Sequence, residues 1–257
     1  MRVISLGWGV QSFALAAMSA LGELPPVDAA IHADTTHERR ETYEFAEWWT
    51  PWLEERGVRV VTVRAARAGV IENWTRTSLQ IPAYTTYENG TPGAMLRRQC
   101  THDWKIAPIR KWLQKNREKS QVEMCMGITL DEWTRMRDSD VKYIRNAYPF
   151  MEQFKSPMSR HKVVRWLLEN GLEIPVKSSC VFCPFRSHAG WREMKLSDNG
   201  DWKRAVDIDR KIRNQVPNYV AYLHRWYTPL EDVDLRNEQD HGQLELWSEE
   251  CTGMCFL

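Results

Sequence analysis

Short apolar runs alternate with longer helical patterns in the first quarter of the chain. Residues 2–6 predict a buried strand, which a glycine-containing turn joins to a helix that opens at Ser12. Residues 29–33 predict a second strand, 38–56 a long helix, and 58–63, almost entirely β-branched, a third strand. Because this alternation favours parallel strands with right-handed crossovers, the expected fold class is α/β with a parallel, Rossmann-like sheet.

The middle of the chain is less regular before the alternation resumes. Residues 64–99 are broken by proline and glycine, and we interpret them as a long excursion over the sheet edge that acts as a substrate lid. A fourth strand is expected at 122–127, a fifth extended segment at 143–150, and an amphipathic helix at 159–170.

The last third of the chain has a different character from the first part. Residues 189–227 have helical patterns, and two cysteines with the spacing Cys-x-x-Cys come just before them. We therefore expect two domains, an α/β domain over 1–175 and a mainly helical, cysteine-bearing region over 176–257 that packs on the first.

Composition excludes some classes of protein. The chain has 257 residues, enough for a full core, and its 35 basic and 34 acidic residues give no overall basic field that would indicate nucleic acid. No apolar run approaches the roughly 20 residues of a membrane span, and residues 13–24 lack the flanks of a signal peptide. We expect a cytoplasmic protein, in which the six cysteines serve as metal ligands or redox groups rather than disulfides.

The first turn carries the earliest chemical signal. Gly7 and Gly9 permit positive φ and close approach of main-chain N–H groups to a ligand, and Ser12 sits where an N-cap or first-turn hydroxyl belongs. A helix N-terminus behind such a turn attracts anions, so we hypothesise a phosphate or pyrophosphate site; tight packing alone is the alternative. Asp34 ends the second strand and is expected beside this turn, where open α/β sheets bind ligands.

The order of the motifs resembles the phosphoadenosine-phosphosulfate reductase-like branch of the PP-loop ATP pyrophosphatases, in the adenine nucleotide alpha-hydrolase superfamily. The resemblance covers roughly residues 1–185. The matching pieces, in chain order, are Gly7-Trp8-Gly9-Val10-Gln11-Ser12 for the family's Ser-Gly-Gly-x-Asp-Ser loop, Asp34-Thr35-Thr36 for its Asp-Thr-Gly turn, Gly127-Ile128 with Arg137 behind it, Pro149-Phe150, and the Cys180/Cys183 pair. Two departures stand out, because Gln11 replaces the loop aspartate and Trp8 replaces a glycine.

The resemblance implies a bound adenine nucleotide, ATP or a related one, together with Mg²⁺. The loop would wrap the phosphates and the end of the second strand would meet the adenine and ribose. Lys105, Arg97 and Arg137 are candidates for stabilising charge on phosphate or sulfate oxygens. The residues implied in nucleotide binding are Gly7, Trp8, Gly9, Val10, Gln11, Ser12, Ala33, Asp34, Thr35 and Gly127.

The cysteines form the second argument. Cys180 and Cys183 suit zinc, a redox disulfide or an iron–sulfur cluster, and Cys100 is a plausible third ligand. By the resemblance we favour a [4Fe-4S] cluster over zinc, with Cys255 as the favoured fourth ligand. Cys251 is the alternative, or a sulfur-handling catalytic thiol, because reductases of the family carry a Glu-Cys motif near the C-terminus. Cys125 lies in a strand pattern and is expected to be buried filler.

Three functions follow from these observations. The leading hypothesis is an enzyme that uses ATP to adenylate an acceptor, either a nucleic acid or a small molecule, and then transfers sulfur to it with the aid of the cluster. A sulfonucleotide reductase is the first alternative, and a non-catalytic zinc- or nucleotide-binding regulator is the second. Expected partners are the nucleotide, the acceptor and a protein sulfur donor or reductant; a homodimer is left open and a membrane is not expected.

Overall fold

The computed structural model describes residues 1–68 and 79–236. These residues form two compact units along the chain. The first consists of Met1–Ala68 and His102–Ser178; the second contains the described residues 79–101 and 179–236. Two segments of the chain therefore form the second unit, one before and one after residues 102–178 of the first unit.

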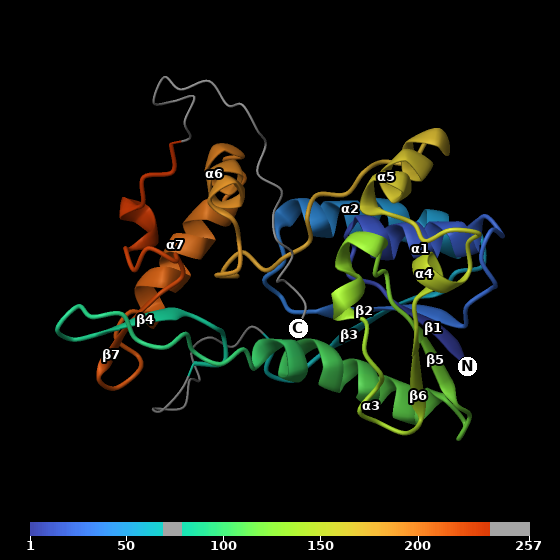
Figure 1. The fold of residues 1–257 in the computed structure, drawn as a ribbon, viewed down its shortest axis with the longest axis horizontal. Coiled ribbons are helices and arrows are strands. Elements are labelled where there is room, and N and C mark those ends of the chain that lie inside the picture. Colours follow the sequence, from blue (N-terminus) through green and yellow to red (C-terminus); the bar gives the residue numbers. More distant parts are fainter. Residues whose placement is uncertain (69–78, 237–257) are drawn as a thin grey trace. The chain divides into compact units, whose positions relative to one another are not determined.

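The first unit is built on a five-stranded sheet in which every pairing is parallel. The spatial order is β3-β2-β1-β5-β6, the Rossmann-like arrangement in which the strand order reverses beside β1. This sheet confirms the predicted α/β class (Figure 1). The strands are β1 (Arg2–Ser5), β2 (Ala29–Asp34), β3 (Val60–Arg64), β5 (Val122–Cys125) and β6 (Ile144–Ala147).

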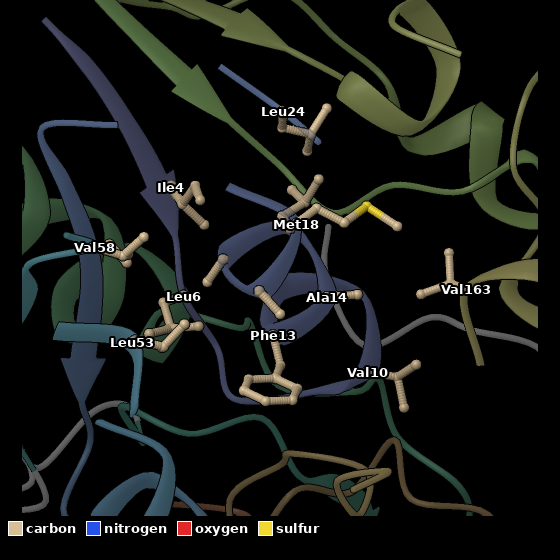
Figure 2. Close-up of a cluster of buried hydrophobic side chains, with 14 of the residues drawn as sticks. Ile4, Leu6, Val10, Phe13, Ala14, Met18, Leu24, Leu53, Val58 and Val163 are labelled. Atoms are coloured by element: carbon tan, nitrogen blue, oxygen red, sulfur yellow. The ribbon is translucent and has the colours of Figure 1, made fainter. Parts of the chain in front are cut away.

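Helices cover both faces of this sheet because successive strand residues point to opposite sides. Ile4 packs with α1 (Val10–Ala20), α2 (Arg40–Glu54) and α5 (Arg160–Glu169), whereas Val3 packs with α3 (Ala107–Asn116) on the other side. Figure 2 shows Phe13, Ala14 and Met18 of α1 inside the first of these clusters. A π-helical turn, Thr101–Ile106, precedes α3; a 3₁₀ turn, Leu130–Arg135, and the short α4 (Pro149–Glu152) flank β6 along the chain.

The helix boundaries differ from the predictions by a few residues. The first helix begins at Val10 rather than Ser12, because the Gly9 carbonyl already accepts a hydrogen bond from the Phe13 N–H. At the start of α5, by contrast, the Ser159 side chain accepts the Lys162 N–H as an N-cap.

The second unit pairs two strands that lie far apart in sequence. β4 (Tyr84–Tyr87) runs antiparallel to β7 (Tyr219–Tyr222), beside α6 (His188–Leu196), α7 (Asp201–Ile212) and a 3₁₀ turn, Leu230–Asp232. The prediction of helix throughout 189–227 is wrong at β7, and the excursion 64–99 contains strand β4. No local pattern could reveal either strand, because each is stabilised by a partner about 130 residues away.

The structure can be compared with two expectations, namely the position of the domain boundary and the absence of a membrane span. The expected division near residue 175 lies close to Ser178, but residues 79–101 group with the second unit rather than with the α/β domain. Within the described ranges, no helix is both long and apolar enough to cross a membrane.

Candidate functional site

In the turn after β1, the residue with a left-handed main-chain conformation is Trp8 rather than a glycine. Trp8 has φ 56°, whereas Gly9 has φ −94° and Gly7 is not left-handed. The expectation that the glycines supply positive φ is therefore wrong. Trp8 tolerates the conformation because its indole is buried beside α1, β2 and α2, with ring centroids 6.4 Å from Phe13 and His32 and 6.3 Å from Phe45.

Ser12 closes this turn onto the first turn of α1. Its Oγ accepts the Gly7 N–H at 3.1 Å and lies 3.2 Å from the Gly9 carbonyl, to which it donates. The predicted first-turn hydroxyl is thus present, although it binds the turn rather than capping the helix. A β-carbon at Gly9 would lie 3.0 Å from Ser178 Oγ, so close approach explains this glycine.

Gly127 brings the end of β5 against the same turn. A β-carbon at this position would lie 2.8 Å from the Gln11 carbonyl carbon and 2.9 Å from the Ser12 nitrogen. Both are main-chain atoms, which cannot move aside as a side chain would. The carboxyl ends of the neighbouring strands β1 and β5 therefore meet the first turn of α1, the place where ligands bind in open α/β sheets.

Asp34 is the last residue of β2, and its carboxylate accepts hydrogen bonds from three residues. Its carboxylate accepts the Thr36 N–H at 2.7 Å, the Tyr43 hydroxyl at 2.8 Å and the Arg64 Nε–H at 2.9 Å. Burial raises the pKa of Asp34, but these hydrogen bonds and the Arg64 charge outweigh it, so the pKa lies below its usual value. Arg64 is available because it is the register partner of Asp34 on the neighbouring strand β3.

A second buried carboxylate follows directly. Glu38 is 2% exposed and accepts hydrogen bonds from Lys105 Nζ and Thr35 Oγ1, both at 3.1 Å. Burial raises the pKa of Glu38, yet the charge of Lys105, then His32, and the hydrogen bonds lower it overall. His32 has a lowered pKa because it is buried, and its Nδ1 lies 3.1 Å from the Leu6 carbonyl.

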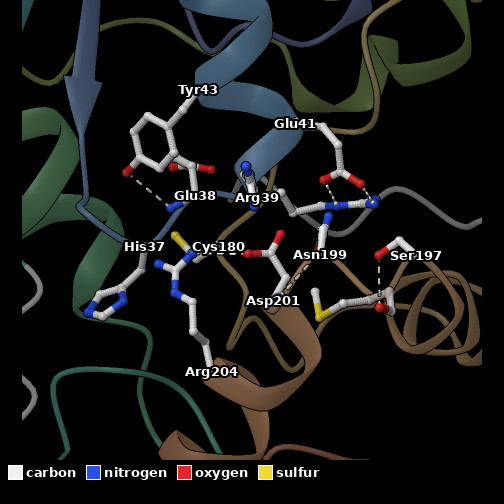
Figure 3. A network of polar contacts seen from close by, with 12 residues as sticks. His37, Glu38, Arg39, Glu41, Tyr43, Cys180, Ser197, Asn199, Asp201 and Arg204 are labelled. Carbon is white, nitrogen blue, oxygen red and sulfur yellow. Dashed lines mark hydrogen bonds and ion pairs between the residues drawn. The ribbon is translucent and has the colours of Figure 1, made fainter.

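The start of α2 adds an ion pair to this region. Figure 3 shows Arg39 extended against the Glu41 carboxylate, with Arg39 Nη2 and Glu41 Oε1 2.8 Å apart. In the same view the Tyr43 hydroxyl accepts the Glu38 N–H at 3.3 Å. Tyr43 therefore links both acidic groups, because it also donates to Asp34; burial, followed by the Asp34 hydrogen bond, raises the pKa of Tyr43.

Gln11, in the first turn of α1, is held at both ends of its side-chain amide. Its Nε2 donates to Glu132 Oε2 at 3.4 Å, and its Oε1 accepts from Arg160 Nη1 at 3.2 Å. Glu132 is also paired with Arg135 at 2.6 Å, while the Arg160 main-chain N–H donates to Asp131. The first turns of α1 and α5 are thus joined by a polar network.

Most of the predicted nucleotide-binding residues lie at one edge of the sheet. The turn residues, Asp34, Thr35 and Gly127 lie at the carboxyl ends of β1, β2 and β5, and Ala33 is buried within β2. Lys105 joins them through Glu38. The Arg137 side chain is exposed, and its main chain is held by the Tyr148 hydroxyl. Arg97 is exposed in the second unit.

The predicted metal ligands are described in part. Cys180 and Cys183 share a turn closed by the hydrogen bond from Cys183 N–H to the Cys180 carbonyl at 3.0 Å, and Cys100 belongs to the same unit. Cys125 is a free thiol and is buried in β5, as expected. Among the residues that the structure describes, no three histidine, cysteine or acidic side chains form a metal-binding group. Cys251 and Cys255 lie outside the described residues.

Sequence reasoning missed several side chains of this site. The predictions did not include Arg64 and Tyr43, which donate hydrogen bonds to Asp34. They also did not include Arg160, which donates to Gln11. Arg64 could have been found, because it ends the third strand as Asp34 ends the second. Tyr43 and Arg160 depend on how helices pack over the sheet, which no local pattern records.

Comparison with known proteins finds similarity among solved structures. No protein-family model matches the sequence, and no curated protein matches it. Among solved structures, the chain is similar to a phosphoadenylyl-sulfate (PAPS) reductase from Candida auris in a phosphate complex, with 12% identity and a TM-score of 0.46 over 68% of this chain and 74% of that one. The fold class rests on the parallel sheet itself.

Proposed function

We propose that this protein is an adenine-nucleotide-binding enzyme of the PP-loop type that carries out sulfur chemistry. The observation that carries the proposal is the close seating of Gly127 on Gln11 and Ser12, which joins two parallel strand ends to a helix N-terminus. Main-chain N–H groups of such a turn, with the helix dipole behind them, favour phosphate oxygens. Asp34 and Thr35, at the next strand end, are the proposed contacts for the sugar and base.

ATP-dependent sulfur transfer is the first form of this function. An acceptor oxygen would attack the α-phosphorus of ATP and expel pyrophosphate, and a sulfur nucleophile would then displace AMP from the adenylated acceptor. Negative charge grows on the phosphate oxygens in both steps, and donors fixed in advance by the turn stabilise it without reorganising. Lys105 is the proposed cation, held at the end of β2 by Glu38.

Exposed aromatic and basic groups in the second unit support a nucleic-acid acceptor. Trp226 is 52% exposed and lies against His188, with ring centroids 4.7 Å apart, next to the exposed Arg225. Aromatic rings beside arginine are the usual means by which proteins stack on unpaired bases.

A sulfonucleotide reductase is the second form, and Gln11 favours it. A cysteine thiolate would attack the sulfur of the sulfonucleotide, break the sulfur–oxygen bond and release the nucleotide; a dithiol reductant would then release sulfite and form a disulfide. Transfer of a sulfonate group requires no carboxylate-held metal, and the neutral amide of Gln11 is compatible with that chemistry. Cys251 is the proposed thiol for this step.

One set of measurements separates these forms. Binding of ATP, AMP and a 5′-phosphosulfate nucleotide is measured by calorimetry on the full chain, followed by assays for pyrophosphate release, sulfite release with a dithiol reductant, and incorporation of labelled sulfur into an oligonucleotide. We expect nucleotide binding and one of these products. Binding without turnover would favour the regulatory alternative, and a chain that binds no adenine nucleotide would overturn the proposal.

Asp34→Asn is the site variant for that experiment, because it removes one buried charge without changing the size of the side chain. Arg145→Ala serves as its control, since Arg145 is an exposed residue of β6 that pairs with Glu123 on the sheet. We expect the affinity for the nucleotide to fall by about tenfold in the first variant, the loss of one charge-assisted hydrogen bond, and to stay unchanged in the second.

A further inference from the structure

Among the described residues, four acidic side chains near the first turn of α1 accept hydrogen bonds from cations or from N–H and O–H donors. Asp34 is paired with Arg64, Glu38 with Lys105 and Glu132 with Arg135. Asp131 accepts the Arg160 main-chain N–H. The carboxylates of Asp34, Glu38 and Glu132 are poor ligands for a further cation, because binding the cation requires breaking an existing ion pair.

Mg²⁺, which the family resemblance implies, does not fit these residues. In nucleotide sites Mg²⁺ is usually held by one or two carboxylates together with the phosphates. Position 11, where the family has aspartate, provides an amide whose oxygen already accepts from Arg160 and whose nitrogen faces Glu132. The N–H groups of a carboxamide donate hydrogen bonds and do not coordinate Mg²⁺, and the amide oxygen of Gln11 is engaged by Arg160.

Arg160 provides the positive charge that the metal would otherwise bring. It is the first residue of α5, its side chain is exposed, and its Nη1 reaches the Gln11 side chain in the first turn of α1. A guanidinium group stays charged at all physiological pH values and presents several N–H donors, which match phosphate oxygens.

We infer that the turn binds the phosphate or phosphosulfate group of its nucleotide without Mg²⁺, and that Arg160, oriented by Gln11, supplies the balancing charge. This inference rests on the proposed function, because it concerns the same turn. It predicts that the site binds nucleotides whose phosphate or phosphosulfate group carries no bound metal ion.

The test compares nucleotide affinity with and without the metal. Calorimetry with ATP and with a 5′-phosphosulfate nucleotide is run on the full chain in EDTA and in excess Mg²⁺. We expect the wild-type affinity for the phosphosulfate nucleotide to agree within about twofold between the two conditions, and Arg160→Ala to weaken it by about tenfold or more, the loss of one charge-assisted contact. Arg165→Ala, an exposed arginine on the same helix, is the matched control and should bind as wild type.

Gln11→Asp provides the converse variant. It restores the carboxylate at the turn, so we expect the binding of ATP to gain a dependence on Mg²⁺ that the wild type lacks. Circular dichroism and thermal unfolding of each variant establish that it is folded, and Arg160→Lys retains the charge if Arg160→Ala does not fold.

The outcomes separate the two claims. A wild type that binds about tenfold more tightly with Mg²⁺, or an Arg160→Ala variant that binds as wild type, would overturn this inference and leave the proposed function standing. A wild type that binds neither nucleotide in either condition would overturn the proposed function itself.

Discussion

Trp8 and Thr36 hold left-handed main-chain conformations, with φ of 56° and 65°, at two positions where glycine would be unstrained. A non-glycine residue in this region costs of the order of 1–3 kcal/mol, which the surrounding contacts must offset. At Trp8 the offset is visible, since its side chain is almost fully buried among aromatic rings. The turn thus keeps the shape of a glycine loop while its side chain contributes to the core.

Gly127 leads to the sharpest prediction for a single residue. In Gly127→Ala the new methyl group would press on main-chain atoms of Gln11 and Ser12, so we expect a loss of about 1–3 kcal/mol in the free energy of unfolding and a weakened nucleotide affinity. Gly7→Ala is the matched control, because its β-carbon would meet only two hydroxyl oxygens at 3.8 Å. Urea unfolding compares the two variants; equal stabilities would contradict the close approach of β5 to the turn.

At the scale of elements, the end of β2 is organised by strand register and by one helix. β3 delivers Arg64 opposite Asp34, and α2 delivers Tyr43 from nine residues further along the chain. The Arg64 side chain is 62% exposed, so solvent screens its ion pair, and the hydroxyl of the half-buried Tyr43 is the better-protected donor.

Removing either donor should change how Asp34 titrates. Because the folded-state pKa of Asp34 is lowered, its contribution to stability is present above the unfolded value near 3.8 and is lost as the pH falls through the folded value. We expect Tyr43→Phe to raise that pKa and to lower the free energy of unfolding at neutral pH by about 1 kcal/mol. Carboxyl carbon NMR of Asp34 and unfolding at pH 7 and pH 3 test this; an unchanged Asp34 titration would contradict the network.

The whole molecule combines an α/β unit with a second unit that carries three of the four cysteines that the structure describes. Measurement of the metal content of the purified protein decides whether the turn that contains Cys180 and Cys183 binds a metal. After anaerobic purification we expect about four irons per chain and a broad absorption band, lost in Cys183→Ala and retained in Cys125→Ala, whose thiol is buried in β5. About one zinc per chain would instead make the turn a structural site; absence of metal would contradict both.

Sequence reasoning recovered the features that depend on neighbouring residues. The parallel strands, the first helix and the positions of Gly7 and Asp34 follow from apolar runs and from the rule that ligand groups stand at strand ends, whereas Gly127 came from the family resemblance. It failed where distant segments decide the outcome. Strand β7 forms only because β4 pairs with it, and the partners of Gln11 come from positions more than 100 residues away.

The sheet order has a consequence for how the chain is synthesised. The centre strand, β1, is made first, yet its β5 neighbour follows about 120 residues later, and the segment 79–101 of the other unit is made in between. Until β5 emerges from the ribosome, one side of β1 presents unsatisfied main-chain N–H and C=O groups, a template for unwanted pairing with another chain. Fragments that end before β5 should therefore aggregate, and chaperone capture should be strongest during that interval of translation.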